Sequence, residues 1–170
     1  MERPELIGAS TKKISLTGAP QSAAIAIQPP TGPAKAKPAT RGSKAKAAVE
    51  LQGKTYLHIE NVVSKKSRTT YEVYVNLPEN PDAATLEEHH VGAMHLFGVV
   101  QASTRSTRSA GNGLTFSIDI TNVVEALKEK NEWDEKNVRV TFLPRAGAER
   151  RAAPAAHDPI RIGRIGIYRA

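Results

Sequence analysis

The second half of this chain alternates apolar and polar residues over several short stretches, which is the pattern of half-buried β-strands. One stretch covers residues 55–62, and Leu57, Ile59 and Val62 lie on or near one face of it. Another covers residues 70–77 and ends at Pro78, which cannot donate to a strand ladder. The positions predicted to face the core are Leu57, Ile59, Val62, Tyr71, Val73, Val75 and Leu77.

Further strands are predicted over residues 90–100 and 114–120, with a polar loop over 105–113 between them. Apolar residues also alternate through Val138, Val140 and Phe142 in a penultimate strand. In the last strand Gly163 predicts a bulge that shifts the alternation. The apolar positions on either side of it are Ile160, Ile162, Ile165 and Ile167.

One helix is predicted from Thr121 to about Asn131. Thr121 or Asp119 stands where a capping side chain belongs. The helix would dock through its apolar face, whose residues recur at i, i+3, i+4 and i+7: Ile120, Val123, Val124 and Leu127.

The N-terminal third divides into two parts. Residues 14–16 and 24–27 resemble short strands across a Gly18-Ala19-Pro20 turn, and such strands need a sheet to pair with. Residues 29–48 contain no Val, Ile, Leu or aromatic residue, so we expect a disordered, protease-sensitive basic linker of Ala, Pro and Lys. The predicted units are an N-terminal strand segment at 1–28, this linker, and a β domain at 49–170.

The predicted fold is mainly β, an antiparallel β-sandwich or barrel of jelly-roll-like type with one short helix. Several short strands joined by turns are typical of this class. Both the sandwich and the barrel remain open at this point.

Charge is unevenly distributed along the chain. The formal net charge is +7, yet residues 55–170 carry fifteen Lys/Arg against fourteen Asp/Glu, so the predicted β domain is almost neutral. The basic segment lacks aromatic residues for base stacking, which favours a solvated linker over a nucleic-acid-binding tail. The chain has no Cys, no apolar run of membrane-spanning length and no apolar signal segment. We therefore expect no membrane partner and a cytoplasmic location.

Four blocks occur in a recognisable order. They are Thr70-Tyr71-Glu72-Val73-Tyr74-Val75-Asn76-Leu77-Pro78, His90-Val91-Gly92-Ala93, residues 114–121 and residues 138–145, followed by the closing isoleucine-rich strand. In order and spacing, residues 49–168 resemble the C-terminal domain of polyphenol oxidases and tyrosinases, named for a Lys-Phe-Asp-Val motif that is Thr70-Tyr71-Glu72-Val73 here. The residues carrying this resemblance are Tyr71, Glu72, Val73, Tyr74, Val75, Asn76 and Gly92.

The resemblance implies a lid over a dicopper oxidase site that is held by six histidines. This chain has five, His58, His89, His90, His95 and His157, and no two have the His-x-x-x-His spacing of one helical face. Residues 5–18 also resemble the segment just beyond the copper-binding helices of bacterial tyrosinases. We therefore expect no copper or other cofactor on this chain, with the copper held by a partner catalytic domain of a tyrosinase or polyphenol oxidase.

A local cluster of His89, His90, Met94 and His95 is the candidate for a Cu(I) contact, because imidazole and thioether suit that ion. Surface or core packing of these residues is the favoured interpretation. The sequence has no catalytic nucleophile motif such as Gly-x-Ser-x-Gly and no phosphate-binding glycine loop.

In the resembled oxidases the lid inserts a bulky side chain where a phenol would bind. The candidates for such a plug are Met94, His95, Leu96 and Phe97, although for Leu96 or Phe97 taken alone a place in the sheet core is the favoured interpretation. The prediction is a detached lid, or latency, domain of a type 3 copper polyphenol oxidase. The alternatives are a free-standing β-sandwich binding module with a nucleic-acid-binding tail, or a catechol oxidase assignment by family name, which the missing copper ligands oppose.

Overall fold

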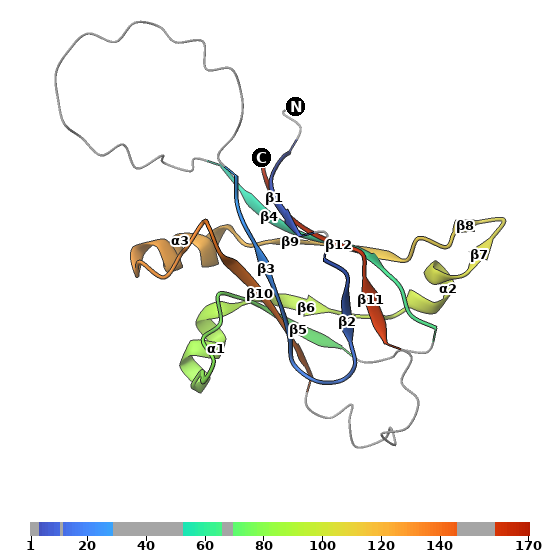
Figure 1. Ribbon diagram of the computed structural model, residues 1–170, viewed down its shortest axis with the longest axis horizontal. Coiled ribbons are helices and arrows are strands. Elements are labelled where there is room, and N and C mark those ends of the chain that lie inside the picture. Colours follow the sequence, from blue (N-terminus) through green and yellow to red (C-terminus); the bar gives the residue numbers. More distant parts are fainter. Residues whose placement is uncertain (1–3, 11, 29–52, 66–69, 146–158) are drawn as a thin grey trace, which may run out of the picture.

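The computed structural model describes residues 4–10, 12–28, 53–65, 70–145 and 159–170. Its main body consists of two four-stranded antiparallel sheets (Figure 1). The first has the order β1 (Glu5–Ser10), β12 (Arg164–Arg169), β4 (Thr55–Val62) and β9 (Leu114–Asp119). The second has the order β3 (Gln21–Ile25), β10 (Val138–Pro144), β5 (Tyr71–Val75) and β6 (His90–Met94). The sheets do not close on each other, so the β-sandwich is confirmed and the barrel is excluded.

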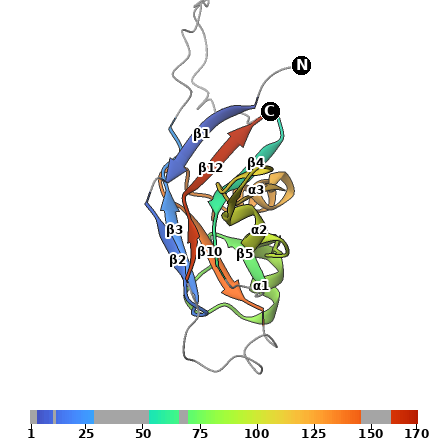
Figure 2. The same cartoon turned by 90° about the vertical axis from the view of Figure 1, so that its right-hand side faces the viewer.

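Two small antiparallel ladders and three helices complete the described structure. β2 (Ile14–Leu16) pairs with β11 (Ile160–Ile162), and β7 (Arg105–Ser106) pairs with β8 (Ser109–Ala110). The helices are α1 (Ala83–His89), α2 (Val99–Ser103) and α3 (Thr121–Glu129). Seen from the side, the helices lie at one side of the molecule and the strands β1, β2 and β3 at the other (Figure 2).

The core follows the alternation of the sequence. All seven positions predicted to face inward in β4, β5 and the residues after β5 are at most 6% exposed. Val138, Val140 and Phe142 of β10 are fully buried. The register break at Gly163 also occurs as predicted, because the C-terminal strand divides there into β11 and β12. The shift lets all four isoleucines around Gly163 reach the core.

The predicted helix is α3, and Val124 and Leu127 form its buried face. Asp119 closes its first turn, because one carboxylate oxygen accepts hydrogen bonds from the Thr121 backbone N–H at 3.0 Å and the Thr121 hydroxyl at 2.6 Å. These hydrogen bonds lower the pKa of the Asp119 carboxyl below its usual 3.8. The Thr121 hydroxyl in turn accepts from the backbone N–H of Thr55 at 2.9 Å, which links α3 to β4.

Two predictions of secondary structure are wrong: the number of helices and the length of the strand over residues 90–100. A single helix was expected, yet α1 and α2 also form, and α1 is capped by the Asp82 carboxylate on the N–H of Thr85 at 2.7 Å. A single strand over 90–100 was expected, yet β6 ends at Met94 and α2 begins at Val99. Gly98 has φ +79, a left-handed conformation that ends the extended chain.

The N-terminal strands pair with strands of the predicted 49–170 unit. β1 pairs with β12, β2 with β11 and β3 with β10, so residues 1–28 contribute strands to both sheets of the predicted 49–170 unit. The sheet that these strands need is supplied by this chain. Residues 29–48, predicted to be a linker, lie outside the described residues. Within the described part of the chain, no helix is long and apolar enough to cross a membrane.

Candidate functional site

The segment between β6 and α2 presents one aromatic side chain to solvent. Met94 and Leu96 point inward and are 0% and 3% exposed, whereas Phe97 is 98% exposed. The turn is closed by a 3.2 Å hydrogen bond from the Val99 N–H to the Leu96 carbonyl, and Gly98 takes the left-handed position. Phe97 therefore stands at the tip of a turn whose neighbours on both sides are anchored in the core.

Phe97 borders an open hollow of about 680 Å³ on the protein surface. Val100, which is 37% exposed, lies one helical turn along and adds apolar surface to the same hollow. His95 and Thr70 supply its polar rim, with 3.4 Å between His95 Nδ1 and Thr70 Oγ1. A fully exposed aromatic side chain beside a second exposed apolar residue is typical of a surface that meets a partner.

The four residues proposed as a Cu(I) cluster do not converge. His89 is buried at the end of α1, and its Nδ1–H donates to the Val75 carbonyl at 2.8 Å. His90 Nε2 lies 2.7 Å from the Glu72 carboxylate on the outer face of β5. Met94 is fully buried, and His95 is exposed. These donors do not fit one copper ion, and no group of three or more His, Asp or Glu side chains among the described residues could hold a metal.

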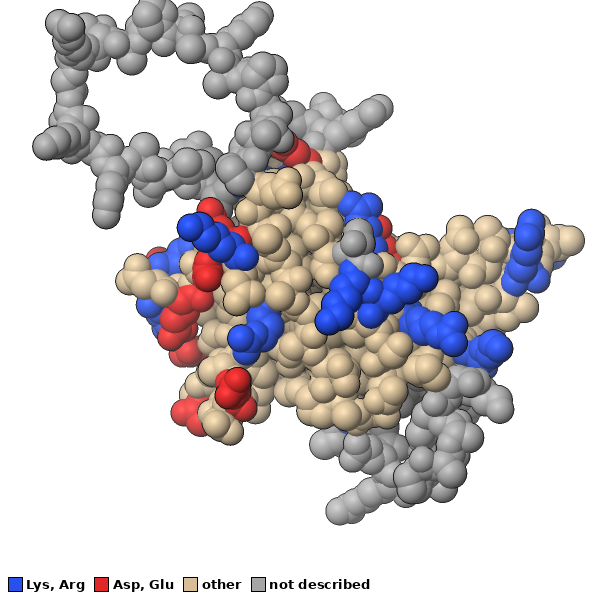
Figure 3. All heavy atoms as spheres, viewed as in Figure 1, with Lys and Arg blue, Asp and Glu red and all other residues tan. Residues whose placement is uncertain are grey.

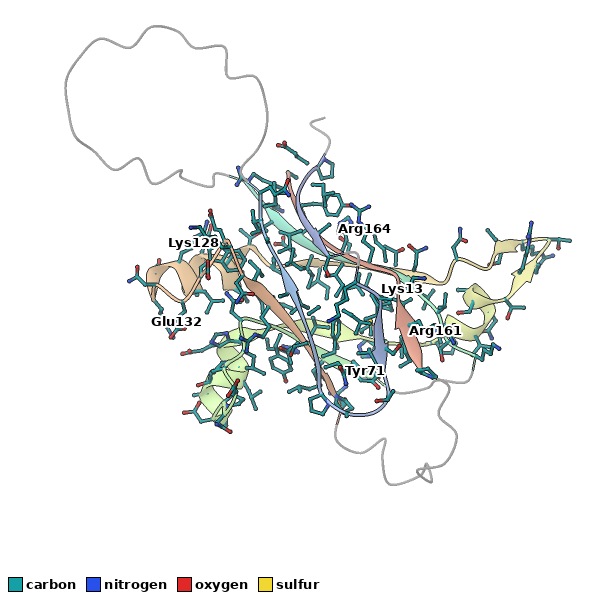
Figure 4. All side chains as sticks on the ribbon, in the orientation of Figure 1. Lys13, Tyr71, Lys128, Glu132, Arg161 and Arg164 are labelled. Carbon is teal, nitrogen blue, oxygen red and sulfur yellow. The ribbon has the colours of Figure 1, made fainter. Side chains whose placement is uncertain are left out.

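Most residues of the family motif are buried in the sandwich, and Glu72 is on its outer face. Tyr71, Val73 and Val75 are buried, and the Tyr71 hydroxyl accepts from the Gly18 N–H at 3.1 Å, joining β5 to the β2–β3 turn. Tyr74 is 9% exposed, and burial raises the pKa of its hydroxyl, helped by the charge of Glu72. Figure 4 shows Tyr71 within the body of the molecule.

The remaining motif residues position neighbouring strands. Asn76, at φ +52, accepts from the Arg139 N–H at 2.8 Å and donates to the Glu132 carbonyl at 3.2 Å. A Cβ on Gly92 would lie 3.3 Å from a methyl of Ile118, so this glycine lets β6 approach β9 closely. These motif residues therefore stabilise the sandwich. The exposed aromatic side chain that could contact a partner is Phe97, between β6 and α2.

A cluster of polar side chains that the sequence did not predict lies on the outer face of the first sheet. Ser117 Oγ and His58 Nε2 are 3.1 Å apart, and His58 Nδ1 is 4.0 Å from the Glu60 carboxylate. Glu60 already accepts from the Tyr168 hydroxyl at 3.0 Å, and the His58 and Tyr168 rings stack at 4.3 Å. The 4.0 Å separation between His58 and Glu60 is beyond hydrogen-bond distance, and the contacts of the cluster join side chains of β4, β9 and β12. Only the tertiary pairing of these strands could have revealed it.

The comparisons with known proteins cover almost the whole chain. Residues 3–170 match the family model described as "Domain of unknown function (DUF7868)". The chain belongs to this family. This DUF7868 domain is also 32% identical over 115 residues to Tyrosinase HcTyr1 of Hahella sp. (strain CCB-MM4), a match covering 68% of this chain. The chain spans 23% of that tyrosinase's length, so it corresponds to part of such a protein.

Two solved structures resemble the DUF7868 domain at lower identity. They are a latent aurone synthase (polyphenol oxidase) co-crystallised with hexatungstotellurate(VI), with a TM-score of 0.49 and 16% identity, and latent apple tyrosinase, with a TM-score of 0.44 and 20% identity. Each match covers 93% of this chain and about a quarter of the other, 25% and 27%. Both TM-scores are below 0.5, so these two matches carry no argument about this chain. The similarity to part of the Hahella tyrosinase confirms the resemblance to the tyrosinase and polyphenol oxidase family.

Proposed function

We propose that this DUF7868 domain is a lid that covers the dicopper pocket of a tyrosinase or polyphenol oxidase catalytic domain. The observation that carries the proposal is Phe97, which is 98% exposed at the tip of a turn that the core holds on both sides. A phenyl ring has the size and shape of the ring of a phenol. Phe97 is therefore the plug, and the copper belongs to the partner.

The other plug candidates are less suitable. Met94 and Leu96 are buried in the sandwich, and withdrawing either would leave a cavity that costs on the order of 2–5 kcal/mol. His95 is exposed but lies beside Thr70 at the rim of the hollow. Phe97 can enter a partner's pocket without any change in this chain's core.

The anchoring of the turn also suits this role. Leu96 and Val99 are buried on either side of the tip, so Phe97 is held in position before docking. A preorganised side chain loses less conformational freedom on binding. If lid and catalytic domain are linked or docked, the ring competes with substrate at high effective concentration.

The test is inhibition of diphenol turnover by the purified chain. The probe enzyme is copper-loaded Hahella tyrosinase trimmed of the 115-residue region that this chain matches, with its own turnover as proof of folding. Wild-type chain should suppress turnover. Phe97→Gly should relieve the suppression while binding falls little, because most interface contacts lie outside the pocket. His95→Gly, a change at the neighbouring exposed position, is the matched control and should inhibit like wild type.

Two results would contradict the proposal. Full inhibition by Phe97→Gly would assign the plug to another residue. Absence of inhibition by saturating wild-type chain would remove the lid function altogether.

A further inference from the structure

Four segments that are distant in sequence meet at the end of the molecule that carries α2. Val63 and Arg161 exchange two backbone hydrogen bonds of 2.9 Å, and β11 pairs with β2 through Ile162 and Ile14. The Ser64 N–H donates to the Ser103 hydroxyl at 3.0 Å, which attaches the C-terminal end of α2 to the same place. The β7–β8 hairpin follows α2 directly.

All four segments carry cations and no carboxylate. Residues 6–25, 61–70, 96–118 and 159–170 contain no Asp or Glu. We call their exposed, described cations the basic end. The basic end consists of Lys12, Lys13, Lys65, Arg105, Arg108 and Arg161. None of these six residues makes an ion pair with another described residue.

The acidic residues gather at the opposite end of the sandwich. Residues 76–95 contain no Lys or Arg, and α1 with its preceding loop carries Glu79, Asp82, Glu87 and Glu88. Figure 3 shows Asp and Glu side chains near α1 and α3, and Lys and Arg side chains over β11 and the β7–β8 hairpin. Lys13 and Arg161 project from this face in Figure 4. A domain that is nearly neutral in total is thus electrically polarised.

The proposed plug stands at the basic end. The helix α2 separates two hollows: Phe97 and Val100 line one, and Ser103, Lys65 and Arg161 line the other, which has a volume of about 240 Å³. The exposed apolar anchor and cations that make no ion pair with another described residue therefore lie at the same end of the molecule. An apolar centre with a charged rim is the usual anatomy of a protein interface.

We infer that the basic end docks on an acidic rim around the partner's pocket and steers Phe97 into it. This inference rests on the proposed function and adds the charge of the partner surface. Complementary charge accelerates association by about 10- to 1000-fold, and salt removes the effect because the Debye length is about 10 Å at 0.1 M. The rate of association should therefore depend on the basic end, whereas the rate of dissociation should depend mainly on the apolar contacts.

Two other occupants could use the same charges, a nucleic acid or the acidic end of a second copy. The exposed apolar residues at the same end, Phe97 and Val100, favour a protein surface over a phosphate backbone. A partner catalytic domain also accounts for Phe97, which an electrostatic contact with α1 of a second copy leaves unused.

The experiment compares two charge-reversal pairs in the full chain by measuring association with the trimmed tyrosinase. Lys13→Glu with Lys65→Glu alters the basic end, and Lys54→Glu with Lys136→Glu makes the same change in net charge at exposed positions elsewhere. At low salt the first pair should slow association about tenfold or more, and the control pair should change it less than about twofold. Raising NaCl should slow the wild type and leave the first pair nearly unchanged.

The possible outcomes distinguish failure of this inference from failure of the lid function. Equal effects of both pairs, or no effect of either while Phe97→Gly still relieves inhibition, would overturn the inference and leave the lid function standing. No binding by the wild type would overturn both. Self-association lost in Lys13→Glu with Lys65→Glu, or tighter salt-dependent binding to nonspecific DNA than to the tyrosinase, would assign the basic end to another occupant.

Discussion

At the scale of single residues, two glycines next to α2 have nearly the same conformation and different surroundings. Gly98 has φ +79, and a Cβ there would meet nothing within 4 Å. Gly113 has φ +81, and a Cβ there would lie 2.2 Å from the Val62 carbonyl oxygen. An alanine at either position would therefore be strained by the positive φ. Only at Gly113 would its Cβ also overlap with β4.

The two alanine substitutions separate these effects. Gly98→Ala should cost on the order of 1–2 kcal/mol, the usual penalty of a left-handed L-residue. Gly113→Ala should cost roughly 1–3 kcal/mol more, because β4 must also move. Denaturant unfolding measures both, and equal losses of free energy would show that β9 can retreat from β4 without cost.

At the scale of elements, α3 is held mainly by one face. Leu127 is 1% exposed, and Leu127→Ala should lower the free energy of unfolding by about 2–5 kcal/mol and the melting temperature with it. Lys128 is a poor control, because it is partly covered and desolvation lowers the pKa of its ammonium group. Glu129 is exposed in the same turn, so Glu129→Ala should change stability by less than about 0.5 kcal/mol. Similar small effects of both changes would place the buried face of α3 elsewhere.

At the scale of the whole molecule, the N-terminal strands close the sandwich. β1 lies at the edge of one sheet and β3 at the edge of the other, so residues 1–28 are bound to both. Trypsin is expected to cut the predicted linker at Lys35, Arg41, Lys44 or Lys46, whereas the Lys37–Pro38 bond resists cleavage. The cut chain should still elute as one folded particle in native size-exclusion chromatography and separate only in denaturant. Release of the N-terminal fragment from a folded remainder that begins near Ala47 would instead show that residues 49–170 fold as a unit without the N-terminal strands.

The sequence by itself determined what depends on local pattern. Alternation identified the buried face of β4, β5 and β10, helical spacing identified Val124 and Leu127 of α3, and Gly163 marked the shift between β11 and β12. These features are readable because a strand or helix buries the same side wherever it packs. The order of the motif blocks likewise indicated the tyrosinase family before any fold was known.

Only the tertiary structure decided which residues face outward together. Leu96 and Phe97 are equally apolar neighbours, and the turn at Gly98 buries one and exposes the other. The partners of β1, β2 and β3 lie more than a hundred residues away, and the basic end assembles from four separate segments. Neither local alternation nor total charge contains such information, because long-range pairing determines which segments become neighbours.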